Sequence, residues 1–167
     1  GPANVLMDYW IEKHLQQPLD LQGNWASTGS VNEELLAQLL EEPYFALAEP
    51  KSTGREYFNG AWLEARLEQL PAVPEPADVQ ATLLELTAAT VATEIENQLT
   101  PDQVFLCGGG AHNTALQKRL QDLLPDCEVA STEKLGMAPD WVEAMTFAWL
   151  AKQRLEKNPQ DTRSITG

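Results

Sequence analysis

The stretch VFLCGGGAHN, residues Val104 to Asn113, joins a short apolar run to three consecutive glycines. Leucines follow at helical spacing over residues 112–124, and CEVAST at 127–132 has the composition of a second short strand. The pattern predicts a β–turn–α–β unit. A glycine turn after a strand lets a ligand approach the backbone, because no Cβ stands in the way. The N–H groups at the start of the next helix attract phosphate.

The glycine turn is open to three interpretations. One is the dinucleotide fingerprint G-x-G-x-x-G, in which Gly108 and Gly110 match, Asn113 replaces the third glycine, and Glu133 stands about where the acid belongs. Another is a purely structural tight turn, with Asn113 as the cap of the following helix. The third is a nucleoside-binding turn of the sugar-kinase, Hsp70 and actin superfamily.

Polar residues ahead of apolar stretches indicate where the other helices begin. Asn4 is a plausible N-cap for a helix over 4–15. Ser30 and Glu33 have the spacing of a capping box, and Asp78 can cap a long helix over 79–99. The expected fold is a helix-rich α/β arrangement with few strands. That shortage of strands fits one lobe of a larger enzyme better than a complete doubly wound sheet.

A last helix is expected over residues 139–157, and it has large and small apolar residues on one face. We expect this face to pack closely against another element. The residues concerned are Trp141, Ala144, Met145, Ala148 and Leu155.

Composition excludes several classes of partner. The formal net charge is −14, so the chain repels phosphate backbones and anionic lipids, and we expect no nucleic acid and no membrane as partners. No apolar run approaches the roughly 20 residues that a membrane span requires. Cys107 and Cys127 lack the spacing of metal ligands, and we expect both to be reduced and structural, with Cys107 buried at the end of the apolar run. A cytoplasmic location fits this cysteine usage.

Several stretches, taken in order over residues 1–167, resemble the C-terminal half of the anhydro-N-acetylmuramic acid kinase family. No single motif among them is specific, but their combination and order are. They are GPANVLMDYWIEKH, DLQGNWASTGSVNEELL, KSTGREYFN, VFLCGGGAHNTALQKRL and DWVEAMTFAWLA.

The resemblance implies a fold and a reaction. The whole chain, residues 1–167, would be the second lobe of an actin-like (ribonuclease H-like) ATPase fold, with the N-terminal lobe as its partner. Family members bind ATP and a sugar in the cleft between the lobes. They use ATP, Mg²⁺ and water to convert 1,6-anhydro-N-acetylmuramic acid to N-acetylmuramic acid 6-phosphate. This is a cytoplasmic step of peptidoglycan recycling, carried out by homodimers.

The resemblance also implies site residues. Gly1, Pro2 and Asn4 match a turn that faces the ATP phosphates, and the family's catalytic Asp would lie just before Gly1. The adenosine-side turn is matched by Gly108, Gly109, Gly110, His112 and Asn113. Glu143 matches an acid that faces the anhydro-sugar. No residue of this chain is expected to bind a metal ion.

Ordinary structural roles compete with several of these assignments. Asp140 and Glu143 have the spacing of a capping box, which is as good an account of Glu143 from the residues alone. His112 suits backbone capping or adenosine packing better than acid–base catalysis. Lys51 and Arg55 could neutralise a phosphate or a sugar carboxylate, or form surface ion pairs. Asp8 could bind Mg²⁺ through water or face solvent, and we expect it to face solvent, as we do His14.

Two other functions stay open beside the kinase. One is another sugar or carboxylate kinase of the same superfamily, and the other is a non-catalytic nucleotide-binding module.

Overall fold

The long helix α4 (Pro76–Gln98) forms the centre of the molecule in the computed structural model, which describes residues 1–98, 100–158 and 160–161. The other helices are α1 (Val5–Leu15), α2 (Glu33–Leu40), α3 (Gly60–Leu67), α5 (Thr114–Leu123) and α6 (Val142–Leu155). The strands are β1 (Gln103–Leu106) and β2 (Glu128–Ser131). Short 3₁₀ turns join them, among them η2 (Ala26–Thr28), η4 (Gly109–His112) and η6 (Pro139–Trp141).

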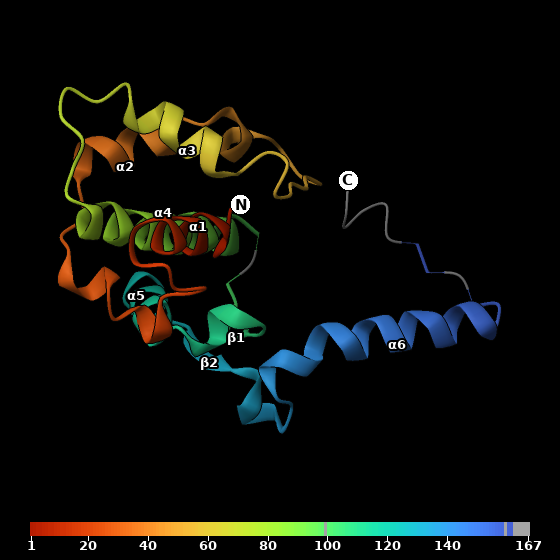
Figure 1. Cartoon of the computed structure of the whole chain (residues 1–167). Helices are drawn as coiled ribbons and strands as arrows, with labels where there is room; N and C mark the ends of the chain where they lie inside the picture. Colours follow the sequence, from red (N-terminus) through yellow and green to blue (C-terminus); the bar gives the residue numbers. More distant parts are fainter. Residues whose placement is uncertain (99, 159, 162–167) are drawn as a thin grey trace.

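Helix α4 is covered on all sides over its first half, because α1, α2, α5 and η2 all pack against it (Figure 1). Every residue from Val79 to Ala88 is buried. The threonines within this helix remain satisfied, since Thr82 and Thr87 donate their hydroxyls to carbonyls four residues earlier. A helix that is apolar on every side is expected to be buried in this way.

The N-caps of several helices differ from those that the local sequence patterns predict. The capping box at Ser30 and Glu33 is wrong, because the side chain of Asn32 caps α2 and the Ser30 N–H donates to Asp78. Asp78 does not cap α4, since that helix already begins at Pro76. Proline suits the first helical position because its missing N–H would have no partner there. Asn4 does precede α1, but its side chain makes no capping hydrogen bond. Leu99, the expected last residue of the long helix, lies outside the described residues.

The predicted β–turn–α–β unit is confirmed. Strands β1 and β2 pair in parallel, with Val104 opposite Val129, and α5 connects them. Leu116 and Leu120 are buried on the inner face of α5. The molecule is therefore a helix-rich α/β structure with a two-stranded parallel sheet in its described part, and none of the described helices is long and apolar enough to cross a membrane.

The expectations for Cys107 and α6 were wrong in part. Both cysteines are free, but Cys107, which directly follows the last residue of β1, is exposed, whereas Cys127 is buried. Helix α6 extends away from the body, and none of its described residues is buried (Figure 1). The close packing that its apolar face predicts is therefore absent among the described residues.

Candidate functional site

The glycine turn between β1 and α5 has a backbone that only glycine adopts easily. Gly108 has φ 64° and ψ −163°, and a Cβ added there would meet no atom within 4 Å. Its N–H donates to the carbonyl of Pro139 at 3.0 Å, so the turn is tied to η6. The space beside Gly108 is open, and a ligand can lie directly against the backbone at this point.

Asn4 brings the beginning of the chain to this turn. A Cβ added to Gly109 would lie 3.6 Å from Asn4 Nδ2, and one added to Gly110 would lie 3.7 Å from both side-chain polar atoms of Asn4. The Asn4 amide therefore rests on the glycine backbone instead of capping α1. This contact joins two segments that the sequence analysis assigned separately to ATP.

A small hollow of about 150 Å³ lies beside this contact and combines residues of three segments. Its volume is well below that of pockets that enclose drug-sized ligands, so it can surround only part of a ligand. The residues lining it are Asn4, Met7, Asp8, Leu19, Asp20, Leu21, Gln22, Gly109, His112 and Asn113. The loop residues 19–22 had no signal in the sequence that marked them for this place.

Asn113 is the N-cap of α5, as one interpretation of the turn predicted. Its Oδ1 accepts the N–H of Leu116 at 3.0 Å, and the residue is buried. Gly23 packs against it so closely that an added Cβ would lie 2.5 Å from the same oxygen. Both the capping bond and the contact with Gly23 hold the Asn113 side chain in place.

His112 contacts the next turn and not the backbone. Its Nε2 lies 2.9 Å from Asp140 Oδ1, and both side chains are largely exposed. This pair adds a second link between the glycine turn and η6, beside the bond from Gly108 to Pro139. The expected backbone-capping role of His112 is not observed.

Gly1 and Pro2 lie apart from this hollow. Pro2 is buried, while Gly1 lines another hollow of about 290 Å³ together with Lys51, Thr90 and Glu94. The Lys51 ammonium pairs with Glu94 and donates to the carbonyl of Phe45 at 3.1 Å. The ion-pair account of Lys51 is thus the one that its contacts support.

Glu143 lies in the first turn of α6 and is exposed. The capping box that competed for it is absent, because Trp141 occupies the N-cap position and no side chain caps the helix. Asp140, the other half of that pattern, contacts His112 instead. The structure therefore offers no structural role that accounts for Glu143 among the residues it describes.

Asp8 was expected to face solvent, and this is wrong in part. It is half-buried one turn after Asn4 and lines the same hollow. Burial raises the pKa of the Asp8 carboxyl, while the nearby positive charge of Arg55 opposes this rise. His14 is exposed as expected, but its ring lies 4.1 Å from that of Trp10, centroid to centroid. Burial lowers the pKa of His14.

No group of three or more His, Cys, Asp or Glu side chains within 1–98, 100–158 and 160–161 could hold a metal. The open backbone at Gly108 leaves room for a ligand beside the turn.

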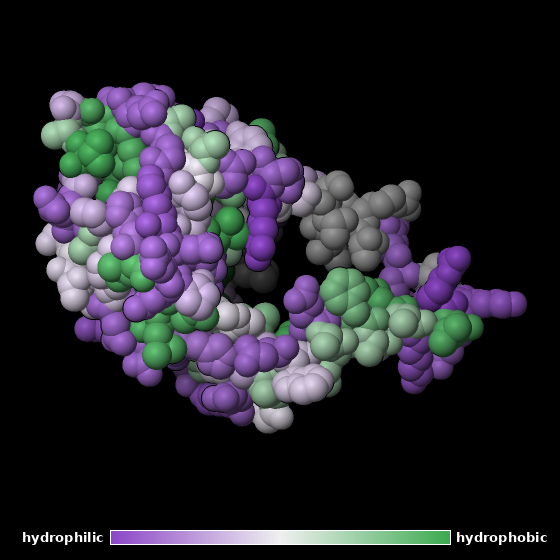
Figure 2. Space-filling view, in the orientation of Figure 1, coloured by the Kyte–Doolittle hydropathy of each residue, from purple (hydrophilic) through white to green (hydrophobic). Residues whose placement is uncertain are grey.

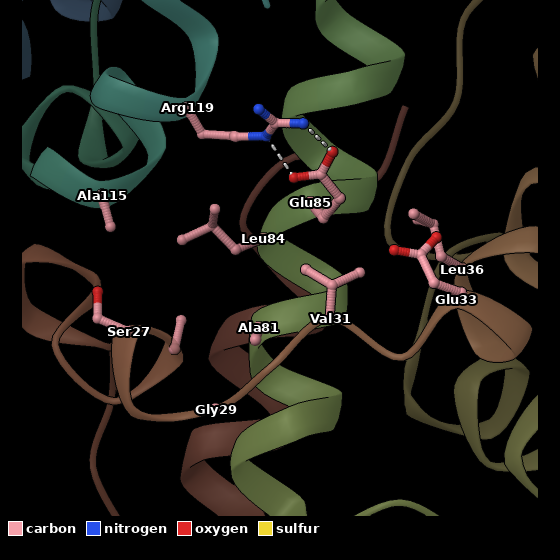
Figure 3. Close-up of a pocket in the computed structure, with 11 residues that line it drawn as sticks. Ser27, Gly29, Val31, Glu33, Leu36, Ala81, Leu84, Glu85, Ala115 and Arg119 are labelled. Atoms are coloured by element: carbon pink, nitrogen blue, oxygen red, sulfur yellow. Dashed lines mark hydrogen bonds and ion pairs between the residues drawn. The ribbon is translucent and has the colours of Figure 1, made fainter. Parts of the chain in front are cut away.

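A larger hollow of about 490 Å³ lies on another side of α4 (Figure 3). Arg119 of α5 forms a two-pronged ion pair there with Glu85 of α4, with Nε–Oε2 and Nη2–Oε1 distances of 2.6 and 2.8 Å. Each charge satisfies the other, and none of the predicted site residues lines this hollow. Sequence reasoning missed the pair, although a lone glutamate within ATLLELTAAT signals a buried partner.

Comparison with known proteins points to one family. The family model described as anhydro-N-acetylmuramic acid kinase matches residues 1–167. A protein of that name from Pseudomonas syringae pathovar tomato is 53% identical over 168 residues, which are 100% of this chain and 46% of the relative. Namesakes from Xylella fastidiosa and Coxiella burnetii are 49% and 50% identical, again over 100% of this chain and over 44% and 45% of their own lengths. The chain spans about half the length of the curated relatives it matches.

Proposed function

This chain belongs to the anhydro-N-acetylmuramic acid kinase family, and we propose that it supplies the adenosine-binding wall of a two-lobed, actin-like kinase. The complete enzyme converts 1,6-anhydro-N-acetylmuramic acid, ATP and water to N-acetylmuramic acid 6-phosphate and ADP. The proposal covers residues 1–167 as the C-terminal lobe, with the cleft facing the rest of the enzyme. The family assignment favours the nucleoside-binding interpretation of the glycine turn over a dinucleotide fingerprint.

The contact between Asn4 and the glycine turn is the observation that carries this proposal. The family's motifs assign the segment of Gly1, Pro2 and Asn4 to the phosphates and that of Gly108, Gly109 and Gly110 to adenosine. A nucleotide bound across both requires them to be adjacent, and the Asn4 amide lies 3.6 and 3.7 Å from the Cβ positions of Gly109 and Gly110. The pairs Gly108–Pro139 and His112–Asp140 then connect this wall to the start of α6, where Glu143 lies.

The reaction breaks the bond between C1 and the bridging O6 while water adds at C1. A carboxylate takes the proton from the water, and O6 becomes the acceptor of the phosphoryl group that ATP supplies. In this proposal Glu143 contacts the sugar and orients it. The glycine turn holds adenosine, with His112 and Asn113 at its edge. The base that activates the water comes from outside this chain, as do the Mg²⁺ ligands.

Location and assembly belong to the same proposal. We expect the complete enzyme to act in the cytoplasm, in the recycling of cell-wall peptidoglycan, and to be a homodimer. One observation on this chain agrees with a cytoplasmic location: both cysteines are unpaired.

The test is Glu143→Gln in the full-length enzyme. ADP release that depends on the anhydro-sugar should fall by about a hundredfold, because the sugar is no longer held in the reactive orientation, while ATP affinity, measured by calorimetry, stays within about twofold. Glu143 caps no helix, so the unfolding temperature should not change. Unchanged turnover would overturn the role of Glu143.

Two controls separate the kinase from its alternatives. A panel of sugar and carboxylate substrates on the full-length enzyme distinguishes it from other kinases of the superfamily. ATP binding without turnover of any of them would favour a non-catalytic nucleotide-binding module. Residues 1–167 by themselves should release no ADP, since the base is outside them, and turnover by this part would refute the lobe assignment.

A further inference from the structure

The hollow beside Gly1, of about 290 Å³, is lined mostly by apolar and aromatic residues. Figure 2 shows a body whose visible surface is largely hydrophilic, with apolar atoms set back on the side where Figure 1 places the start of the chain. The side chains with titratable groups in the lining of the hollow are those of Tyr44, Lys51 and Glu94. The ion pair between Lys51 and Glu94 is therefore the charged feature of a largely apolar hollow, and the function proposed above gives it no role.

The Lys51 ammonium is held in place by three neighbours. Its Nζ lies 2.5 Å from Glu94 Oε1 and 3.1 Å from the carbonyl oxygen of Phe45, and it stands 5.5 Å from the centroid of the Tyr44 ring. The side chain of Lys51 is only 11% exposed. An ammonium group has three N–H bonds, and the two acceptors among the described residues use two of them. One N–H of Lys51 is therefore left for a further acceptor.

One face of α4 shows in which direction the chain approaches Lys51. Residues 87, 90 and 94 lie on this face, because they are three and four positions apart. The Thr87 hydroxyl donates to the carbonyl of Ala3 at 3.0 Å. About one turn further along the helix, a Cβ added to Gly1 would lie 3.5 Å from Thr90 Oγ1. Traced backwards from Ala3 to Gly1, the chain thus runs along α4 towards Glu94.

The residues that precede Gly1 in the full-length enzyme continue from this point, and the family resemblance places the catalytic Asp two residues before Gly1. Two residues of extended chain span at most about 7 Å, and α4 rises about 6 Å from Thr90 to Glu94. An Asp at that position therefore reaches the level of Glu94 and Lys51. The charge of Lys51 already acts at Gly1. Burial lowers the pKa of the Gly1 amino group and the Lys51 ammonium lowers it further, while Glu94 opposes both.

We propose that Lys51 is a positioning residue for the catalytic base, and that its remaining N–H donates to the carboxylate of the Asp that precedes Gly1. The ion pair with Glu94 fixes the ammonium, and the ammonium in turn aims the carboxylate at the water that adds to C1. A neighbouring positive charge also favours the ionised form of a carboxylate, which is the form that accepts a proton. The proposal rests on the function proposed above, in which the base lies outside this chain.

The test is the pH dependence of kcat/KM for the anhydro-sugar in the full-length enzyme at saturating ATP. Lys51→Met removes the positive charge, so the pKa of the base rises and the acid limb of the profile should move to higher pH by about one unit. The loss of orientation should also lower kcat by about tenfold, with the KM for ATP within about twofold. Lys51→Arg keeps the charge and should keep the acid limb near its original pH. An acid limb that stays in place in Lys51→Met would overturn the proposal.

Glu94→Gln should have the opposite effect on the profile. It removes a negative charge beside the base and keeps the shape of the side chain, so the acid limb should move to lower pH. This variant carries the test where Lys51→Met folds poorly. Lys118→Met, at an exposed lysine of α5, is the matched control and should leave the profile unchanged. Loss of packing lowers activity without moving the limb in opposite directions, so shifts of the same sign in the Lys51 and Glu94 variants would refute the proposal.

A stability cycle tests the same contact without any turnover. Lys51→Met is combined with the substitution of the preceding Asp by Asn in the full-length enzyme. Since Lys51 donates to that carboxylate in this proposal, Lys51→Met should lower the unfolding temperature clearly less in the Asn background than in the parent enzyme. Equal losses in the two backgrounds would overturn the proposal. Coupling together with a failed kinase assay would refute the proposed function and leave the contact of Lys51 with the Asp standing.

Discussion

Asn4 and Gly110, far apart in the sequence, lie close together: a Cβ added to Gly110 would lie 3.7 Å from both Oδ1 and Nδ2 of Asn4. A side chain at Gly110 would thus reach the Asn4 amide at ordinary van der Waals distance. Asn4 does not take the capping role that its position before α1 suggests.

Gly108 should tolerate substitution less well than Gly109. Gly108→Ala places a Cβ in a backbone region that is almost confined to glycine, which should cost about 1–3 kcal/mol of the free energy of unfolding. The Cβ of Gly109→Ala only reaches ordinary contact with Asn4 Nδ2 at 3.6 Å, so that variant should lose less than about 1 kcal/mol. Urea unfolding of the full-length enzyme measures both. Gly108→Ala should also weaken ATP binding, and equal stability losses would contradict the assigned backbone conformation.

Two roles of Asn113, capping α5 and binding ATP, should be separable by substitution. Asn113→Ala removes the acceptor of the Leu116 N–H and should destabilise the protein by about 1 kcal/mol. Asn113→Asp keeps an acceptor oxygen and should restore most of that loss. If Asn113 serves only as a cap, ATP affinity recovers together with stability in the Asp variant. Full stability with weakened ATP affinity would instead show that the amide itself contacts the nucleotide.

Stability should depend on pH through Glu42, which is buried against α3. Burial by itself raises the pKa of this carboxyl, but hydrogen bonds from Tyr57, Trp62 and Arg66 outweigh it and lower the pKa below its ordinary value of 4.5. Since the folded-state pKa is the lower one, the stabilisation is present above about pH 4.5 and is lost as the pH falls through the folded-state pKa.

Glu42→Gln tests this dependence. The variant should lose about 2 kcal/mol of stability at neutral pH, and the difference from the parent protein should shrink below about pH 4.5. Glu12→Gln, at an exposed carboxylate of α1, is the control and should change little. Thermal unfolding between pH 3 and 7 provides the measurement. A difference that stays constant over this range would contradict the assignment.

The Glu85–Arg119 pair should behave as a unit. Arg119→Met leaves the Glu85 carboxylate largely buried without a counter-charge and should cost about 3 kcal/mol. Glu85→Leu combined with Arg119→Met should recover much of that loss, because neither charge then has to be desolvated. Denaturant unfolding of the single and double variants measures the coupling, and strictly additive losses would exclude it.

The β–turn–α–β unit was predictable because its signals are local. Its apolar run, its glycines and the leucine spacing of α5 act within a few residues of one another, and the parallel pairing of β1 and β2 follows from the helical connection. Asn113 as the cap of α5 was predictable for the same reason. The predicted caps at Ser30 and Asp78 were wrong, because Asn32 and Pro76 are also suitable helix starts. Sequence patterns by themselves do not show which of two nearby starts the helix uses.

The candidate site was predictable as a set of segments but not as an arrangement. The family resemblance places Asn4 and Gly108, Gly109 and Gly110 at ATP, and the structure adds that the Asn4 amide lies beside Gly109 and Gly110. In the structure Gly1 lines a different hollow from the one beside the glycine turn. Asp8 and residues 19–22 line the hollow beside the glycine turn. Sequence spacing does not contain this information, because each contact depends on how α1 and α5 both pack on α4.

Local chemistry alone thus specified the strand, the glycine turn and the helix that follows, and the resemblance of several stretches indicated the family. Tertiary packing decided which polar side chains cap helices, which pair with each other, and which residues share a hollow with the glycine turn. These outcomes depend on tertiary packing, because a polar side chain such as that of Glu85 or Asn4 interacts with whichever group the fold places beside it. The apolar face of α6 is the remaining case. Its pattern predicts a packed helix, but none of its described residues is buried within this chain.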